Sequence, residues 1–195
     1  MKFRKTFIRS GIIIAIILAS VIFGVIYQKV SDNVERSKYP LDYKEFVEKY
    51  SSEYGVPQNV IYAVIKTESG FDSSLLSDDG RIGLMQVSPE TLEEYKEELH
   101  DSYDTGMLYD PETNIKYGTY RLSKIFLKVG TWRAVFAAMA TDTDTVLGWL
   151  ADPAYGETAE LQIPKLLNIP DEYAREYAER LEKVSETYKE LYFNK

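Results

Sequence analysis

The stretch VIYAVIKTESGF, residues 60–71, places a carboxylate where an apolar side chain is expected. If the stretch is helical, Ile61, Val64 and Ile65 fall at positions i, i+3 and i+4 of one face. Glu68 follows at i+7 and extends this inward stripe. A charged side chain on a buried stripe is costly unless it is paired, neutralised or required for chemistry. Spacing alone leaves two interpretations open: a catalytic acid, or a helix-terminal glutamate that caps nearby N–H groups.

Helical periodicity dominates the chain from residue 41 onward, and no segment shows the two-residue alternation typical of a strand. The region after Gly70, rich in Ser, Asp and Gly, is expected to be a loop. The sequence therefore predicts a mainly α domain over 41–195, large enough to bury its own core. The expected helices are 41–54 closed by Gly55, 57–70, 88–99 capped by Ser88, 110–130 capped by Asp110, a central apolar helix at 131–140, and 170–193 with a stripe of Tyr173, Tyr177, Leu181, Val184, Tyr188 and Leu191.

The composition excludes several kinds of site. The chain has no cysteine and a single histidine, so disulfides, cysteine nucleophiles and histidine-rich metal sites are ruled out. His100 lies in a polar run and is expected to be a solvated residue at a helix end. Asp142 and Asp144 alternate in TDTDT, but the glycine and distal glutamate of a calcium loop are absent. A solvated turn is expected there, and no metal or cofactor is predicted.

The N-terminal region differs from the rest. Four basic residues lie within residues 1–10, and the seventeen residues 11–27 carry no charge. A helix of that length measures roughly 26 Å, enough to span a bilayer core. No clear small-x-small cleavage site follows, so an uncleaved signal anchor is favoured over a signal peptide. A charge-free run that starts nine residues after Lys2 argues against a buried core helix. We expect a cytoplasmic tail (1–10), a transmembrane signal anchor (11–27), a stalk (28–40) and a C-terminal domain on the cell-wall side of the membrane.

The charge of the C-terminal part excludes some partners. Residues 31–195 contain 18 Lys or Arg and 31 Asp or Glu, a net charge of −13. Such a domain does not bind nucleic acid or an anionic surface through its overall charge. Recognition of an acidic polymer would depend on shape, hydrogen bonds and aromatic contacts, for which sixteen tyrosines and two tryptophans are available.

A half-buried carboxylic acid at the end of a helix suits one reaction class. Burial against Ile65 and Phe71 is expected to disfavour the ionised form of Glu68. A protonated carboxylic acid is what glycosidic cleavage needs at the departing oxygen. The N–H groups and polar side chains of the following loop are suited to holding a sugar.

Several motifs with a common spacing extend this argument. Glu68 and Ser69 end a helix, Ser77 follows nine residues after the glutamate, and Gly83-Leu84-Met85-Gln86 begins fifteen residues after it. A Pro-Glu-Thr helix start and an Asn-Ile-x-x-Gly pattern at 114–118 come next. Together these resemble the lytic transglycosylase domain of bacterial cell walls, a relative of goose-type lysozymes. The resemblance covers roughly residues 41–191 and implies a lysozyme-like helical fold.

The resemblance implies a reaction on peptidoglycan. Glu68 matches the family's single catalytic acid, which protonates the bond between N-acetylmuramic acid and N-acetylglucosamine. The same carboxylate then acts as base on the muramoyl 6-hydroxyl, which attacks its own anomeric carbon and gives a 1,6-anhydro end without water. The lack of an obvious second carboxylate fits this scheme, because the substrate's acetamido group can assist.

The same resemblance assigns neighbouring roles. Ser77 matches a serine that contacts the N-acetyl group, and Met85 and Gln86 match residues that line the sugar subsites. Ser69 is expected to orient the Glu68 carboxylate. No cofactor is implied, and the only partner is the peptidoglycan strand, with no protein partner indicated.

The chain also departs from the family pattern. The tyrosine and asparagine that usually follow Ala-Ala in the central helix are replaced by Met139 and Ala140. Arg121 stands where a tyrosine is usual, and the later Glu-Thr-Arg-x-Tyr pattern survives only at 173–177. Two explanations compete. In the first, the site is active, because Tyr117 or Tyr120 fills the space or because Met139 makes the pocket drier. In the second, the site is weakened and the fold only holds glycan as a scaffold. Retention of the acid and its neighbours favours activity, with a hydrolytic muramidase on the same fold as a further alternative.

Overall fold

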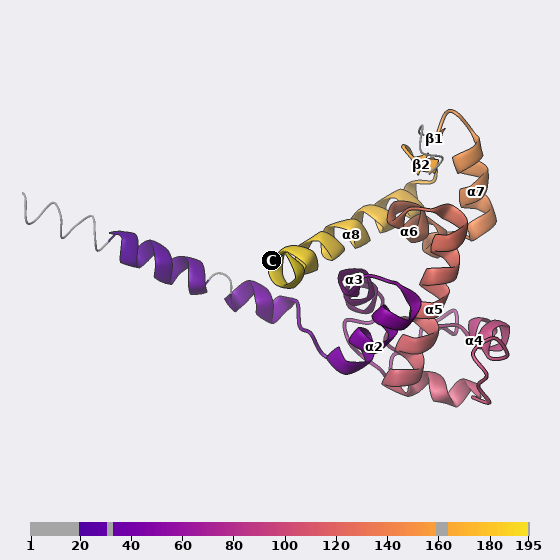
Figure 1. The fold of residues 1–195 in the computed structure, drawn as a ribbon, viewed down its shortest axis with the longest axis horizontal. Helices are drawn as coiled ribbons and strands as arrows, with labels where there is room; N and C mark the ends of the chain where they lie inside the picture. Colours follow the sequence, from indigo (N-terminus) through magenta and orange to yellow (C-terminus); the bar gives the residue numbers. More distant parts are fainter. Residues whose placement is uncertain (1–19, 31–32, 159–163, 195) are drawn as a thin grey trace, which may run out of the picture. The chain divides into compact units, whose positions relative to one another are not determined.

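The computed structural model describes residues 20–30, 33–158 and 164–194. The chain separates into two units, Met1–Pro40 and Leu41–Lys195 (Figure 1). The elements of the second unit are α2 Lys44–Tyr54, α3 Gln58–Glu68, α4 Pro89–Tyr95, the 3-10 helix η1 Thr105–Tyr109, α5 Pro111–Val129, α6 Trp132–Ala140, α7 Thr143–Ala151, β1 Gly156–Thr158, β2 Pro164–Leu166, α8 Glu172–Tyr188 and the π-helical turn η2 Lys189–Phe193.

In the first unit, residues 20–30 and 33–38 are helical. The expected cytoplasmic tail, residues 1–10, lies outside the described residues, as does the part of the expected anchor that precedes residue 20. Within the stretches that the structure does describe, no helix combines the length and the apolar character needed to cross a bilayer.

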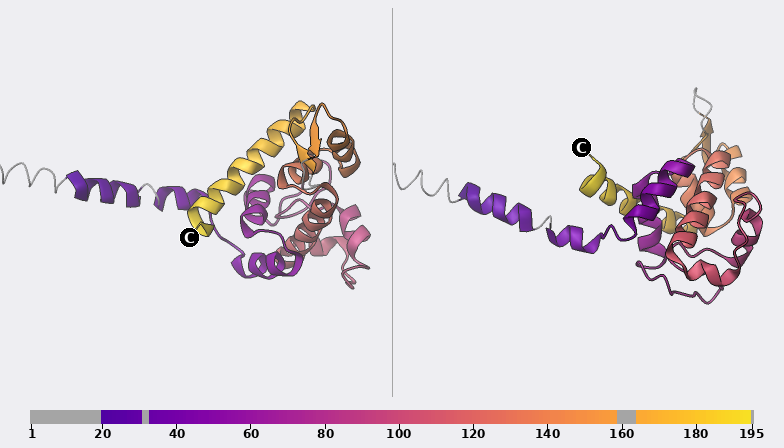
Figure 2. Two further views of the ribbon diagram at one scale, coloured as in Figure 1. Left: turned by 45° about the horizontal axis from the view of Figure 1, so that its top comes forward. Right: turned by 60° about the horizontal axis from the view of Figure 1, so that its bottom comes forward.

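Helix α3 lies in the core of the second unit. Its residues Val60–Ile65 are all buried, because the helix packs against α2 on one side and α8 on another. Helix α8, yellow in Figures 1 and 2, also packs along α6, whose residues Ala134–Ala138 are buried as expected for a central apolar helix. The long helix α5 contacts α2, α4, η1, α6 and α7, so it joins the ends of the domain.

The helix boundaries follow local capping chemistry. Gly55 and Gly130 end α2 and α5 in the left-handed region, at φ 70° and 78°, as expected for C-terminal glycines. Ser88 accepts a hydrogen bond from the Thr91 backbone N–H, and Asp110 accepts one from the Thr113 backbone N–H at 2.9 Å. These four predicted helix ends are confirmed.

Helix α7 was not expected, because the TDTDT segment was interpreted as a solvated turn. Asp142 instead is the N-cap, and its carboxylate accepts the Thr145 N–H at 2.8 Å. That backbone hydrogen bond holds the pKa of Asp142 below its usual value. Val146 and Leu150, four residues apart, are buried and fix the helix to the core.

Three further expectations need correction. A two-stranded antiparallel hairpin pairs Gly156 with Leu166, where no strand was expected, because strands of three residues are too short to show an alternation. Helix α4 ends at Tyr95 and not near residue 99, and the following turns lead to exposed His100 at φ 55°. Tyr173, expected on the buried stripe of α8, is 64% exposed.

Candidate active site

Glu68 is the last residue of α3 and its side chain is only 7% exposed. Ile61 and Ile65, which precede it on the same helical face, are fully buried. The prediction that the carboxylate extends the inward stripe is therefore confirmed. The helix places an acid at the boundary between the core and a polar pocket.

Two donors from distant parts of the chain hold this carboxylate. The Tyr177 hydroxyl, on α8, donates to Oε1 of Glu68. The Arg81 guanidinium, in the loop 71–87, donates from Nη1 to Oε2 at 3.2 Å. A hydrogen-bond donor and a nearby cation both stabilise a carboxylate. The sequence predicts burial against Ile65 and Phe71 but neither of these two donors.

Tyr177 is well suited to its role as a donor. It is 6% exposed, and burial, followed by the negative charge of Glu68 and the hydrogen bond to it, raises the pKa of the Tyr177 hydroxyl. The phenol therefore keeps its proton at neutral pH. The Arg180 guanidinium lies over the Tyr177 ring, 5.4 Å from the ring centroid, in a cation–π contact.

A pocket of about 480 Å³ opens in front of the acid. Elements α3, α5, α6 and α8 meet there with the loop 71–87. Its lining consists of Thr67, Glu68, Asp79, Arg81, Arg121, Met139, Ala140, Thr141, Tyr173, Tyr177 and Arg180. Met139 and Ala140, which replace the tyrosine and asparagine usual in the resembled family, thus line the same pocket as the acid. Tyr177, on another helix, supplies a hydroxyl to the acid.

Ser69 and Ser77, the two serines near the acid in sequence, form hydrogen bonds with backbone groups. The Ser69 hydroxyl donates to the Leu84 carbonyl at 2.8 Å and accepts from the Phe71 N–H at 3.2 Å. These bonds join the end of α3 to the loop, and a contact with the Glu68 carboxylate is not among them. The Ser77 hydroxyl accepts the Arg81 N–H at 2.9 Å and donates to Asp79, so it closes the turn that presents Arg81 to the acid.

Met85 and Gln86 lie inside the loop. Both are 3% exposed, and neither lines the pocket in front of Glu68. The Gln86 amide donates to the Gly83 and Leu75 carbonyls, at 2.9 and 3.3 Å. The Met85 N–H donates to Asn114 Oδ1 at 2.8 Å. In this structure the two side chains support the loop from within, where a lining of the sugar subsites was expected.

The motif that contains them depends on one glycine. Gly83 has φ 74°, in the left-handed region that favours glycine. A Cβ there would lie 2.5 Å from Asn114 Nδ2 and 2.6 Å from the Leu108 carbonyl oxygen. Since Asn114 Nδ2 bonds both the Ile82 and Leu108 carbonyls at 2.8 Å, a larger residue would displace the amide that fixes the loop.

The two tyrosines proposed to approach the acid lie elsewhere. Tyr117 is fully buried and its hydroxyl donates to Asp101 at 3.1 Å. The Tyr120 hydroxyl donates to Glu98, at the surface. The explanation that either fills the space beside Glu68 is therefore wrong. The sequence signal for Tyr177 is the surviving pattern at 173–177, which predicts a buried helix stripe and resembles a weakened family motif.

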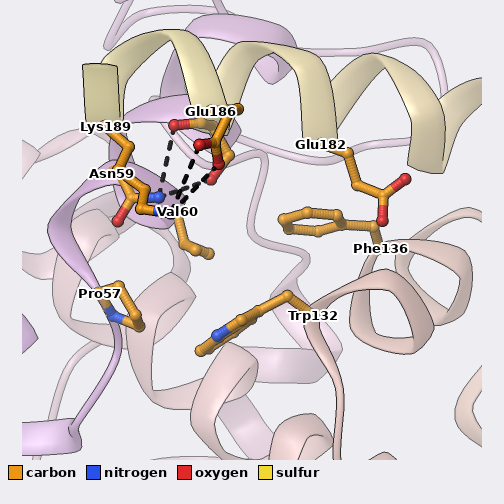
Figure 3. A pocket seen from close by; sticks show the side chains of 9 residues that line it. Pro57, Asn59, Val60, Trp132, Phe136, Glu182, Glu186 and Lys189 are labelled. Carbon is orange, nitrogen blue, oxygen red and sulfur yellow. Dashed lines mark hydrogen bonds and ion pairs between the residues drawn. The ribbon is translucent and has the colours of Figure 1, made fainter. Parts of the chain in front are cut away.

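A second pocket, of about 490 Å³, lies at the opposite ends of α3 and α8. Figure 3 shows Trp132 and Phe136 below the α8 ribbon, with Glu182 and Glu186 on the α8 side. The two carboxylates have side chains 38% and 56% exposed and are paired with Arg133 and Lys189. Because a proton donor for glycosidic cleavage has to be shielded, the pocket at Glu68 is the better candidate.

Comparison with known proteins agrees with this geometry. Residues 45–161 match the family model described as the transglycosylase SLT domain. The chain belongs to the transglycosylase SLT domain family. The match covers more than half of the chain, including Glu68 and the loop after it, and it confirms the resemblance identified in the sequence.

Individual relatives support the family assignment. The soluble lytic murein transglycosylase of Escherichia coli K12 is 31% identical over 130 residues, which is 65% of this chain and 20% of the relative. The membrane-bound lytic murein transglycosylase C of Serratia proteamaculans is 32% identical over 106 residues, or 53% of this chain and 29% of the relative. The chain thus spans less than a third of the length of these curated SLT-domain relatives.

Solved structures confirm that this chain has the lysozyme-like fold of lytic transglycosylases. The crystal structure of the 70 kDa soluble lytic transglycosylase from Escherichia coli matches with a TM-score of 0.71 and 27% identity, covering 83% of this chain and 26% of that one. A complex of the 70 kDa soluble lytic transglycosylase with bulgecin A matches with a TM-score of 0.71 and 26% identity, over the same shares of the two chains.

Proposed function

We propose that this chain cleaves the bond between N-acetylmuramic acid and N-acetylglucosamine in peptidoglycan and leaves 1,6-anhydromuramoyl ends. The observation that carries the proposal is the buried Glu68 carboxylate, which opens into a pocket and is held by Tyr177 and Arg81. Membership in the SLT domain family, whose relatives are named lytic murein transglycosylases, supports the same substrate.

Glu68 acts twice in the proposed reaction. Its protonated form gives a proton to the glycosidic oxygen, so the bond to the departing N-acetylglucosamine breaks. The muramoyl 6-hydroxyl then attacks the anomeric carbon, and the Glu68 carboxylate takes the hydroxyl proton. The acid returns to its protonated form, and no water enters the product. The acetamido group of the substrate assists, since Asp79, the other carboxylate of the pocket lining, is bonded to Ser77 and Arg81.

In this proposal the Tyr177 hydroxyl positions the Glu68 carboxylate and donates a hydrogen bond to it while the carboxylate is charged. Arg81 stabilises the carboxylate that exists between the two proton transfers. Ser69, Ser77, Met85 and Gln86 support the loop 71–87, which we infer contributes backbone groups to the sugar subsites.

Product analysis tests the proposal. Purified peptidoglycan treated with the wild-type chain is expected to yield anhydro-ended muropeptides by mass spectrometry, and Glu68→Gln to lower the yield about 10²–10⁴-fold. Reducing-end products alone would indicate a hydrolytic muramidase. Glycan binding without any cleavage by the wild type would indicate a scaffold, an alternative motivated by Met139 and Ala140 in the pocket.

We further propose that residues 11–27 anchor the chain in a membrane, with residues 41–195 on the cell-wall side. The apolar side chains of residues 21–27 support this, because Val21, Phe23 and Tyr27 are 58%, 70% and 68% exposed. Membrane fractionation of the full chain and of a chain lacking residues 1–27 tests it: the first is expected in the membrane fraction and the second in the soluble one. Recovery of both in the same fraction would contradict the anchor.

A further inference from the structure

The pocket at Glu68 is rich in arginine although the domain is acidic. Arg81, Arg121 and Arg180 bring three guanidinium groups to it, from the loop 71–87, α5 and α8. Residues 31–195 have 31 acidic and only 18 basic side chains. The three positive charges of the arginines are therefore opposite in sign to the net charge of the domain.

The carboxylates that line the pocket do not neutralise all three arginines. Glu68 and Asp79 both pair with Arg81, at 3.2 and 2.9 Å. Among the described residues, no ion pair joins Arg121 or Arg180 to a carboxylate. Arg180 is held over the Tyr177 ring, three residues and about 4.5 Å along the helix axis from the tyrosine that bonds the acid. Two positive charges thus face the pocket close to the proposed reaction centre.

We propose that Arg121 and Arg180 bind a carboxylate of the substrate, so that the site selects glycan strands whose muramoyl units carry free carboxylates. This rests on the proposed function for the identity of the polymer. Guanidinium groups bind carboxylates through paired, charge-assisted hydrogen bonds, and a partly enclosed pocket strengthens them. The acetamido and hydroxyl groups of the sugars can accept hydrogen bonds from arginine, but they carry no charge to balance these two side chains.

The muramoyl unit offers the carboxylate from two sources. One is the stem peptide, which bears free carboxyl groups. The other is the lactyl group of the sugar itself, which is an amide while the peptide is attached and becomes a carboxylate once the peptide is removed. The chemistry at the arginines is the same, and three forms of the polymer separate the two sources.

Binding is measured by pull-down of the full chain on beads that carry the polymer coupled through its reducing ends, in the cold and at short times, because glycan without cross-linking peptides is soluble. The three forms are untreated peptidoglycan, peptidoglycan stripped of stem peptides by an amidase, and peptidoglycan whose carboxylates are converted to neutral amides with a carbodiimide and an amine. The proteins are the wild type, Arg121→Gln/Arg180→Gln, and Lys183→Gln. Lys183 is exposed on the same helix as Arg180 and does not line the pocket, so it controls for the loss of a positive charge.

The expected direction is opposite to that of bulk electrostatics. Neutralising the polymer removes its repulsion from a domain of negative net charge, and on that ground alone binding should rise. We expect instead a fall of about fivefold for the wild type and for Lys183→Gln, the size of a partly solvated charged contact. Arg121→Gln/Arg180→Gln should bind untreated peptidoglycan about fivefold more weakly than the wild type and show no further fall on amidation.

Each outcome of these binding measurements either supports or overturns the inference. Equal or stronger wild-type binding to the amidated polymer overturns the inference, as does an arginine variant that behaves like Lys183→Gln. If the stripped polymer binds like the untreated one, the lactyl carboxylate suffices; if it binds like the amidated one, the peptide supplies the carboxylate. Anhydro ends without carboxylate-dependent binding would leave the proposed function standing alone, and carboxylate-dependent binding without anhydro ends would leave this inference standing alone.

Discussion

The Tyr177 hydroxyl donates a hydrogen bond to the Glu68 carboxylate, although 109 residues separate the two in sequence. The contact joins the C-terminal end of α3 to the N-terminal half of α8, two helices that pack on each other in the core. Because both side chains are almost fully enclosed, the bond fixes the direction in which the acid faces the pocket. The consequences for catalysis and stability can be measured.

Replacing Tyr177 by phenylalanine should lower anhydro-product formation about tenfold, because a hydrogen bond to a charged group contributes about 1.5–3 kcal/mol. The ring and its packing remain, so the fold should be kept. Tyr117→Phe is the matched control, since Tyr117 is also buried and its hydroxyl also donates to a carboxylate, that of Asp101, but it does not line the pocket. Initial rates with defined glycan strands give the comparison, and equal rates for the two variants would show that the bond to Glu68 has no role.

Replacing Arg81 by glutamine should lower anhydro-product formation about threefold, the size of a partly exposed ion pair. Its guanidinium lies 3.2 Å from Glu68 Oε2 and, in the proposed reaction, stabilises the carboxylate that exists between the two proton transfers. The measurement is the initial rate of anhydro-product formation, compared with Lys183→Gln as a control for lost charge. Equal rates for the two variants would show that the contact between Arg81 and Glu68 has no role in the reaction.

Replacing Asn114 by alanine should destabilise the domain by about 3 kcal/mol. The buried amide bonds the Met85 N–H and the Ile82 and Leu108 carbonyls, each at 2.8 Å, and its loss leaves these backbone groups without their partner. The free energy of unfolding in urea measures the effect. Asn59→Ala, which removes a part-buried bond to Ser185, should cost about 1 kcal/mol and serves as the reference. Equal losses for the two variants would show that Asn114 does not pin the loop.

The domain should lose stability in alkaline solution through its buried tyrosines. Burial raises the pKa of Tyr95 to about 12, and that of Tyr50 to about 12 with burial again the largest cause. In the unfolded chain a tyrosine has a pKa of about 10. Between these values the folded form binds more protons than the unfolded form, so stability falls as pH rises.

The stabilising contribution is complete below about pH 10 and is lost as pH approaches about 12. Tyrosinate absorbance followed together with far-ultraviolet circular dichroism is the measurement. The two signals should change in one cooperative step for most of the phenols. Gradual ionisation with an unchanged helical signal would show that these rings are open to solvent in the folded state.

Much of the fold could be predicted because it depends on local chemistry. The apolar spacing of α3, the caps Ser88 and Asp110, and the closing glycines at 55 and 130 all act within a few residues of themselves. The errors fell where tertiary contacts decide. Asp142 resembles a turn residue until buried Val146 and Leu150 fix the helix that it caps, and the hairpin strands are too short to have a pattern.

The sequence by itself determined that Glu68 lies on a buried stripe at a helix end and that its motif spacing is that of the SLT domain family. Only the tertiary structure decided which side chains contact it: Tyr177 and Arg81, and neither Tyr117 nor Tyr120. It also decided that Ser69, Ser77 and Gln86 bond backbone groups of the loop. The physical reason is that a helical period fixes which face of one helix turns inward, whereas the partners across a pocket depend on how separate helices pack against each other.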